Sequence, residues 1–217
     1  MSGSSNAFVL EQVSLSIHKQ ALFAPLNLRV EPGTVTSVVG ASGSGKSSLL
    51  KYLCGILPSE IVASGTIKIG DDELGSMPPQ LRRLGLLFQD PLLFPNLDVA
   101  GNVLFGLRDR GSRNERQHRV DEALKSVGLD GFGARDPATL SGGQQARVAL
   151  LRVLLAEPRA LLLDEPFHSL DDDNRERIRE LVFSEARNRG LPTLLVTHDK
   201  SDVVAANGPV VELGSHS

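Results

Sequence analysis

The sequence has little of what marks secreted, membrane-spanning or nucleic-acid-binding proteins. Cys54 is its only cysteine, which excludes an internal disulfide framework and favours a reducing compartment. The most apolar region, residues 148–165, is interrupted by Arg152 and Pro158, well short of the about 20 apolar residues that a transmembrane helix needs. Lys and Arg number 23 against 26 Asp and Glu, a formal net charge of −3, whereas general nucleic-acid binders are usually basic. We therefore expect no nucleic-acid partner and, for any role at a membrane, a position outside the bilayer.

Size and composition predict one globular domain in the cytosol. A chain of 217 residues can form one substantial α/β core but is too short for two. Apolar residues make up 41% and charged residues 23%, as in ordinary globular proteins. The first stretch, MSGSSNAF, lacks the basic region and apolar core of a signal peptide.

The first half of the chain predicts a small sheet followed by a strand, a glycine-rich loop and a helix. Partly alternating runs that end at turn residues are typical of a mostly antiparallel sheet, and they cover 8–17, 22–33 and 65–74. Residues 34–39 form a short β-branched run that suits a buried strand. The helix after the loop is expected to end at Pro58, and its apolar positions are Leu49, Leu50, Leu53 and Ile56.

The second half predicts a helical insertion and then an alternating α/β pattern. Residues 90–140 have helical periodicity and no clear strand. From residue 141 onward, helices and strands alternate, which favours a parallel sheet. The expected order is helix 144–157, strand 160–165, helix 174–189 and strand 192–199.

The loop between the buried strand and its helix has the composition of a phosphate-binding loop. It fits the pattern G-x-x-x-x-G-K-[ST], and its residues are Gly40, Ala41, Ser42, Gly43, Ser44, Gly45, Lys46, Ser47 and Ser48. Glycines let main-chain N–H groups converge on a phosphate, and the helix N-terminus adds unpaired donors. Lys46 is expected to reach the phosphates and the Ser47 hydroxyl to bind Mg²⁺. A flexible linker is the alternative, but linkers do not usually join a buried strand to an apolar helix.

Polar side chains at the ends of three predicted strands suggest the rest of the site. Asp164 and Glu165 end a buried strand, where ligands of open α/β sheets bind. Asp164 suits the Mg²⁺ shell, and Glu165 is expected to orient and polarise an attacking water. His198 follows the next strand and is a candidate γ-phosphate sensor. Gln89, after an apolar run, is a candidate for contact with Mg²⁺ or the water. Each of these residues also has an alternative interpretation when it is taken singly. The two carboxylates could belong to an acidic turn, His198 could be a structural histidine, and Gln89 could be a polar surface residue.

A second glycine-rich segment completes a recognisable set of motifs. LSGGQ, residues 140–144, precedes an apolar helix. A simple helix cap explains Ser141 and the glycines but not the whole set. In order, the motifs are GASGSGKS, Gln89, LSGGQ, ALLLDEP, the SLD of residues 169–171 and His198. This set resembles the ATP-binding cassette (ABC) ATPases over nearly the whole chain.

The resemblance implies the fold class. It is an α/β P-loop NTPase core of the RecA-like type with a mostly parallel sheet, joined by a small antiparallel β subdomain and a helical subdomain. The chain, 1–217, is then a single ABC ATPase domain, with its core in 7–89 and 141–217 and its helical subdomain in 90–140.

The resemblance also implies the activity, ATP hydrolysis with Mg²⁺. In this family the LSGGQ segment binds the nucleotide held by the other subunit, so an ATP-bound homodimer is expected. The residues involved are Ser141, Gly142, Gly143 and Gln144. The family pattern places Asp171 across the dimer seam.

The segment FQDPLLFPNLDVAGNVLFGL resembles ATPase subunits of bacterial importers for small solutes. This implies two membrane permease subunits, an extracytoplasmic solute-binding protein and a location on the cytoplasmic face of the inner or plasma membrane. A groove for a permease helix is expected beside apolar residues that fit a subdomain core equally well, namely Leu92, Leu93, Phe94 and Leu97. The alternatives are a soluble assembly or remodelling ATPase and a lipoprotein-release or export subunit.

The sequence departs from the family pattern at several positions. Where the family stacks an aromatic ring on adenine, this chain has Ile17 next to His18, which predicts weaker base stacking. Ser48 replaces a common threonine and keeps its hydroxyl. The remaining departures are His168 in place of a small residue, and Asp98 and Gly101 in the importer-like segment.

Overall fold

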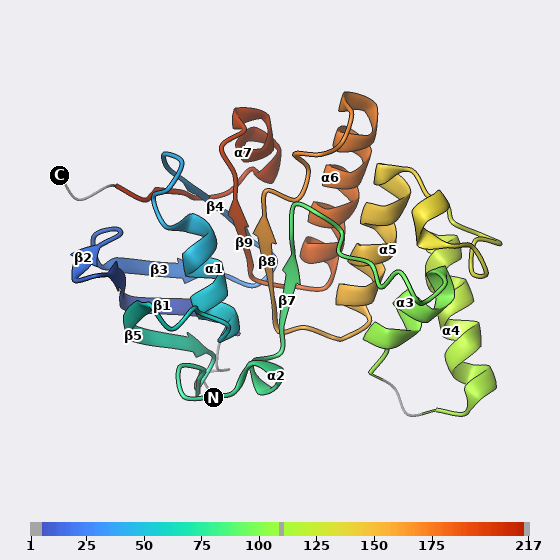
Figure 1. The fold of residues 1–217 in the computed structure, drawn as a ribbon, viewed down its shortest axis with the longest axis horizontal. Coiled ribbons are helices and arrows are strands. Elements are labelled where there is room, and N and C mark those ends of the chain that lie inside the picture. Colours follow the sequence, from blue (N-terminus) through green and yellow to red (C-terminus); the bar gives the residue numbers. More distant parts are fainter. Residues whose placement is uncertain (1–5, 109–110, 215–217) are drawn as a thin grey trace. The chain divides into compact units, whose positions relative to one another are not determined.

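The computed structural model describes residues 6–108 and 111–214, which form two compact units (Figure 1). The core unit comprises the described residues of Met1–Leu86, Arg159–Glu165 and Phe183–Ser217. The helical unit comprises those of Leu87–Pro158 and Pro166–Val182. Each unit is described by itself. The subdomain bounds expected from the sequence, 90–140, stay a prediction.

An antiparallel sheet occupies the N-terminal part of the core unit. Its order is β2-β1-β5-β6, and β3 pairs with the other side of β1. The strands are β1 (Phe8–Ile17), β2 (Gln20–Ala21), β3 (Leu26–Val30), β5 (Ile61–Ile69) and β6 (Asp72–Glu73). Alternation buries Phe8 and Leu10 in the first part of β1 and Val13 and Leu15 in the second, and an irregularity in register lies between the two parts. The expected strand at 22–33 is thus shorter, and the one at 65–74 starts earlier and is divided by a turn.

A second sheet has the order β10-β4-β9-β8-β7, with β10, β4, β9 and β8 parallel. Its strands are β4 (Val35–Val39), β7 (Leu84–Leu87), β8 (Ala160–Asp164), β9 (Thr193–Val196) and β10 (Val210–Glu212). The strands β8 and β9 are buried almost throughout, which is why they read as continuous apolar runs. Because β4, β9 and β8 are neighbours and parallel, the loops that follow them emerge at one edge.

The helices of the core unit are α1 (Lys46–Cys54), α2 (Pro79–Arg82) and α7 (Lys200–Ala206). Helix α1 does not continue to Pro58 as expected. It ends at Gly55, whose φ of 78° is left-handed and whose N–H donates to the Tyr52 carbonyl at 2.9 Å. The buried Arg82 guanidinium donates to the Tyr52 and Leu53 carbonyls at 2.8 and 2.7 Å, which satisfies the last turn. Ile56 therefore lies outside the helix and is 48% exposed.

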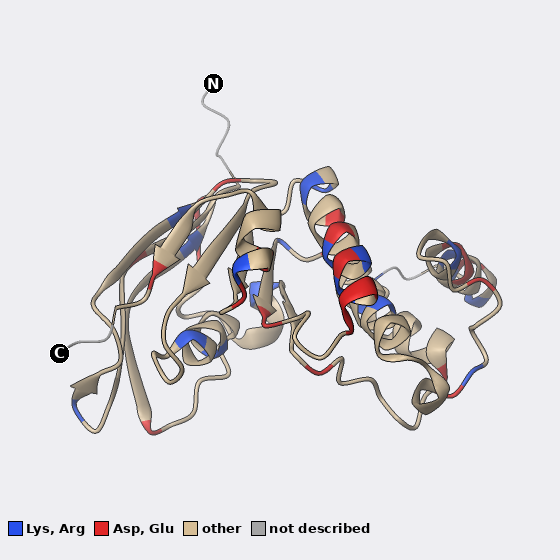
Figure 2. Ribbon diagram, turned by 90° about the horizontal axis from the view of Figure 1, so that it is seen from above, with Lys and Arg blue, Asp and Glu red and all other residues tan. Residues whose placement is uncertain are grey.

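The helical unit contains α3 (Val99–Gly106), α4 (Arg113–Ser126), α5 (Gly142–Leu154), the 3₁₀ turn Pro137–Thr139 and the first part of α6 (Asp172–Asn188). Its apolar core includes Val99, Val103, Val120, Leu124 and Val148. Acidic and basic residues follow one another along α6 (Figure 2), while its apolar positions Ile178 and Val182 are buried. Among the described residues, every helix is too short or too polar to cross a bilayer.

Candidate functional site

The phosphate-binding loop lies between β4 and α1 in the core unit. Gly45, directly before α1, has a left-handed φ of 89°. This conformation favours glycine, and a Cβ there would also make a tight contact, 3.1 Å from a ring carbon of Phe23. The first turn of a helix leaves its N–H groups without intrahelical partners. The loop therefore presents main-chain donors and the positive end of a helix dipole, which together favour an anion.

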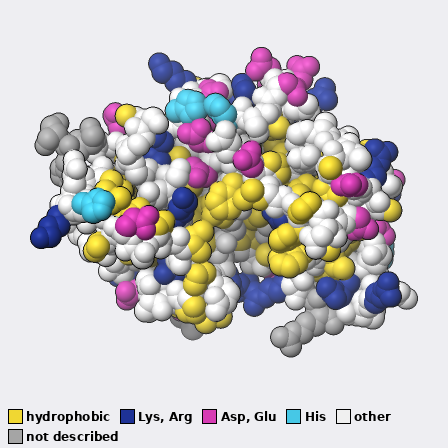
Figure 3. Space-filling model, viewed as in Figure 1, with side chains coloured by type: hydrophobic (Ala, Val, Ile, Leu, Met, Phe, Trp, Pro, Cys, Tyr) yellow, Lys and Arg dark blue, Asp and Glu magenta, His cyan; other side chains and the backbone are white. Residues whose placement is uncertain are grey.

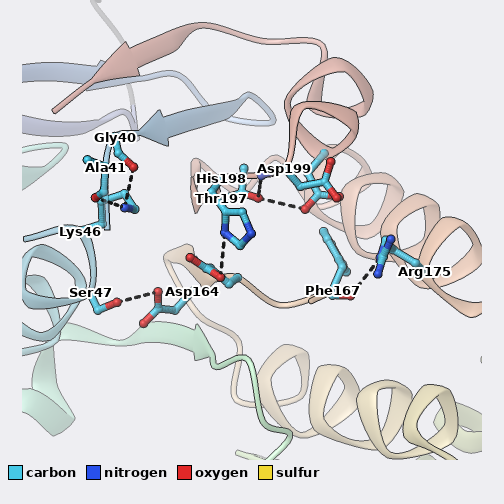
Figure 4. Close-up of polar contacts among 12 residues, drawn as sticks. Gly40, Ala41, Lys46, Ser47, Asp164, Phe167, Arg175, Thr197, His198 and Asp199 are labelled. Carbon is cyan, nitrogen blue, oxygen red and sulfur yellow. Dashed lines mark hydrogen bonds and ion pairs between the residues drawn. The ribbon is translucent and has the colours of Figure 1, made fainter. Parts of the chain in front are cut away.

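Lys46 is held inside this loop. Its residue is only 7% exposed, and its Nζ donates to the carbonyls of Gly40 and Ala41 at 2.8 Å each (Figure 4). A buried ammonium needs such partners. The loop thus fixes a positive charge at its centre, where phosphate oxygens would accept from the same group.

A hydroxyl and a carboxylate meet beside the loop. Ser47 Oγ donates to Asp164 Oδ1 at 3.0 Å (Figure 4), which joins the start of α1 to the end of β8. Burial raises the pKa of the Asp164 carboxyl, and the Ser47 hydrogen bond acts in the opposite direction. Two oxygen donors of this kind suit Mg²⁺, and a cation would offset the cost of burying the charge. The residues therefore fit the predicted magnesium ion.

Glu165 and His198 face each other across the ends of β8 and β9. His198 Nδ1 lies 3.1 Å from Glu165 Oε2. Glu165 has a left-handed φ of 47°, an uncommon conformation for a residue with a side chain. Its N–H donates to the Val196 carbonyl at 2.9 Å. An oriented carboxylate beside an imidazole is an arrangement able to accept a proton from water.

These groups line one cavity of about 710 Å³ in the core unit. The predicted loop residues other than Ser44, together with Glu165 and His198, form its lining. Asp164 is not part of the lining but accepts a hydrogen bond from Ser47, which belongs to it. At one end the lining is apolar, formed by Ile17, Leu22 and Ile61. The sequence did not point to Leu22 or Ile61. The pairing of Ile17 with Ile61 between β1 and β5 brings the latter there.

The other predicted site residues belong to the helical unit. Ser141 caps α5: its Oγ accepts from the Gln144 N–H at 3.3 Å, and Gln144 Oε1 accepts from the Ser141 N–H at 3.0 Å. Gln89 is exposed, and its carbonyl accepts from Ser169 Oγ at 3.3 Å. Contact of Gln89 or of Ser141, Gly142, Gly143 and Gln144 with a nucleotide stays a prediction.

Asp171 is held at the start of α6. It accepts from the N–H and the side-chain amide of Asn174 at 3.1 and 2.7 Å, and these bonds lower the pKa of its carboxyl. Asn174 in turn packs against Gly143, where a Cβ would lie 2.8 Å from Asn174 Oδ1. A larger residue at position 143 would therefore require the Asn174 side chain to move.

A sequence profile of the family described as ABC transporter matches residues 23–168. The chain belongs to this family. It is 43% identical over 196 residues to the ABC transporter ATP-binding protein YnjD of Escherichia coli K12, covering 90% of each chain. It is 44% identical over 207 residues to the Fe(3+) ions import ATP-binding protein FbpC of Streptomyces avermitilis, covering 93% of this chain and 58% of that protein. The chain thus spans about half the length of several curated relatives.

Solved structures of ABC cassettes resemble the chain throughout. A dimeric post-hydrolysis state of the ATP-binding cassette MJ0796, bound to ADP and Pi, matches with a TM-score of 0.77 and 30% identity, covering 95% of this chain and 94% of that one. Another dimeric structure of the same cassette matches with a TM-score of 0.76. The predictions of an ABC-type ATPase and of its P-loop fold are confirmed.

The apolar end of the cavity of this ABC ATPase leads to a prediction on ATP affinity. Replacing Ile17 by Tyr should add a stacking surface for a base, an interaction typically adding about 0.5–1.5 kcal/mol beyond burial. We expect the Kd of a non-hydrolysable ATP analogue, measured by titration calorimetry, to fall roughly 2- to 10-fold. Val62→Tyr is the matched control, because neighbouring residues of a strand face opposite ways and Val62 is 67% exposed. Equal affinities for the Ile17→Tyr variant and the parent would contradict this role.

Proposed function

We propose that this ABC ATPase binds Mg²⁺·ATP in the cavity of the core unit and that its hydrolysis drives solute import through two separate permease subunits. The observation that carries the chemistry is the convergence, in one cavity, of the phosphate loop, the Ser47 hydroxyl and the Glu165–His198 pair. Relatives named as import ATP-binding proteins, for Fe(3+) ions and for 2-aminoethylphosphonate, support the direction of transport.

We assign each predicted polar site residue a part in this reaction. Lys46 and the main-chain N–H groups of the loop bind the phosphates of ATP. Ser47 and Asp164 hold the magnesium ion, which when bound neutralises phosphate charge. Glu165 accepts the proton of the attacking water, and His198 orients the Glu165 carboxylate and senses the γ-phosphate. Gln89 is assigned to the water or the magnesium shell.

The helical unit supplies the second half of a site on a partner copy. The capped start of α5 combines the N–H groups of Gly142 and Gly143 with the positive end of a helix dipole, so it suits a γ-phosphate. We assign Ser141, Gly142, Gly143 and Gln144 to the nucleotide of the other subunit and Asp171 to the seam between the two. Dimeric structures of the related cassette support a two-fold homodimer.

The docking surface that we propose for the permease lies on the helical unit. It is formed by the segment before α3 and by α3 itself, and its exposed apolar residues are Leu92 and Phe105. Leu92 and Phe105 are 56% and 68% exposed, and the rings of Phe94 and Phe105 are 4.6 Å apart. Hydrophobic side chains gather over this region of the face shown in Figure 3. Arg152 donates to the carbonyls of Leu92 and Pro91 at 2.9 and 3.0 Å, which holds the segment in place. Leu93, in contrast, packs against the core, so only part of the apolar segment is available to a partner.

We assign the ATPase to the cytoplasmic face of a membrane, where this surface would contact the inward ends of the permease pair. A solute-binding protein on the other side of the membrane would select the cargo.

The experiment is purification of the chain from detergent-solubilised cells, followed by reconstitution with the recovered permease. We expect two multi-span membrane proteins to co-purify and solute to stimulate ATP hydrolysis. Leu92→Glu should reduce the ratio of stimulated to basal activity roughly 10-fold or more, since truncating or charging a central interface residue typically costs at least about 2 kcal/mol. Val204→Glu, at an α7 position that is 77% exposed, should not change that ratio. Recovery of soluble partners only would favour an assembly or remodelling ATPase instead.

A further inference from the structure

A buried hydroxyl–carboxylate pair lies directly behind the Glu165–His198 pair in the core unit. Thr197 and Asp202 are only 1% and 3% exposed, and Thr197 Oγ1 donates to Asp202 Oδ2 at 3.0 Å (Figure 4). The same hydroxyl accepts from the Asp199 N–H at 3.0 Å. Burying a carboxylate is costly unless it is hydrogen-bonded, so this contact fixes Thr197 firmly to the start of α7.

Helix α7 does not need this bond as its cap. Asp199 is the residue before the helix, and its Oδ1 accepts from the Ser201 N–H at 2.7 Å, which satisfies a donor of the first turn. The Thr197–Asp202 bond acts instead on the segment that leaves β9.

That segment, residues 196–198, holds Glu165 at two points. The Val196 carbonyl accepts from the Glu165 N–H at 2.9 Å, and His198 Nδ1 lies 3.1 Å from its carboxylate. Glu165 needs both contacts because its left-handed backbone, with φ at 47°, persists only where the surroundings impose it. Thr197 lies between the two contacts, so its position sets both.

We propose that Thr197 and Asp202 are positioning residues for ATP hydrolysis, which hold segment 196–198 so that Glu165 and His198 keep their working geometry. The inference rests on the proposed roles of Glu165 and His198. Without the Thr197 hydroxyl the segment can shift, and small displacements of a catalytic group lower the rate of the chemical step. We expect nucleotide binding to be retained, since the phosphate loop lies between β4 and α1 and Lys46 begins α1, away from segment 196–198 in the sequence.

The first test compares Thr197→Val, which removes the hydroxyl and keeps the shape, with Thr197→Ser, which keeps the hydroxyl. We expect Thr197→Val to lower kcat roughly 10-fold, because a small displacement of the catalytic group slows the chemical step, with KM for ATP within about twofold of the parent. Ser should retain kcat within about twofold. Loss of the same size in both variants, or a rise in KM in place of a fall in kcat, would overturn the proposal.

Two double-mutant cycles distinguish an effect on the position of Glu165 and His198 from a general loss of folding. In Thr197→Val combined with Asp202→Ala, the double variant should be no slower than the slower single variant, because both act through one hydrogen bond. In a Glu165→Gln background, Thr197→Val should cause no further loss in single-turnover hydrolysis. Additive losses in either cycle overturn the proposal, and unfolding midpoints above the assay temperature show that the variants compared are folded. If Glu165→Gln itself hydrolyses ATP at the parent's rate, the assigned role of Glu165 fails, whatever Thr197 does.

Discussion

Glu165→Gln should leave ATP binding intact and lower turnover by about 10²–10⁴-fold, the usual contribution of a general base. In the parent, His198 Nδ1 lies 3.1 Å from Glu165 Oε2. Glutamine has nearly the same shape and can keep this place beside His198, but its amide cannot accept the proton of the attacking water. ATP then remains between two copies of the chain. We expect gel filtration of the variant with Mg²⁺·ATP to show dimers that persist, and steady-state phosphate release to fall.

Glu31→Gln is the control for charge. Glu31 also lies in the core unit, its side chain is 52% exposed, and its ion pair is with Arg29, so its loss should cost at most about 1 kcal/mol of stability and leave turnover unchanged. Elution of the Glu165→Gln variant as monomer alone, at saturating ATP, would refute the two-copy mechanism. Normal phosphate release would refute the role of Glu165.

The sequence predicted the edge of the parallel sheet better than any other part of the molecule. The loop after β4, the carboxylates after β8 and His198 after β9 each follow a buried strand, and β4, β9 and β8 are neighbours. Few strand orders are compatible with the connection rules of α/β sheets, and ligands of such sheets bind at the carboxyl ends of the strands. For this reason the polar groups could be expected together before their distances were known.

Contacts between segments far apart in the chain could not be predicted. The helix was expected to end at Pro58, yet α1 ends at Cys54 with Gly55 as its cap, an end that local rules also allow. Local rules could not give the Arg82 guanidinium from α2, which takes up the free carbonyls. Ile61 reaches the cavity only because β5 pairs with β1 in one register, and alternation alone does not fix a register. The Thr197–Asp202 hydrogen bond could not be predicted either, since a threonine and an aspartate near the start of a helix are equally suited to capping its main-chain N–H groups.

The residues of the helical unit show a different limit. The LSGGQ segment was expected to present free donors, and the structure adds that the side chains of Ser141 and Gln144 already bond to each other's main chain. Because the Gln144 N–H is already bonded to Ser141 Oγ, the donors that we assign to a phosphate are the N–H groups of Gly142 and Gly143. A site completed by a second copy of the chain cannot be read in full from one copy.

Lys46→Ala should abolish productive ATP binding. Lys46 is the one lysine or arginine among the residues that line the cavity, and hydrogen bonds to charged groups contribute about 1.5–3 kcal/mol each. Loss of two such bonds to phosphate oxygens should raise the Kd for ATP roughly 10²- to 10⁴-fold. Titration calorimetry checks this, with Lys51→Ala as the matched control, because Lys51 is an exposed lysine on the same helix.

A thermal-shift experiment then distinguishes ligand binding from structural support by Lys46. The ammonium bonds to the Gly40 and Ala41 carbonyls at 2.8 Å, so its removal also costs the free protein some stability. A ligand at 100 times its Kd stabilises the folded state by about 2.7 kcal/mol, which for a domain of this size raises Tm by roughly 5–10 °C. If Lys46 binds phosphate, the Lys46→Ala variant loses this ATP-induced rise, while Lys51→Ala retains it. If Lys46 only braces the loop, the free variant melts earlier and the rise with ATP persists, and the lysine would then have no part in binding the nucleotide.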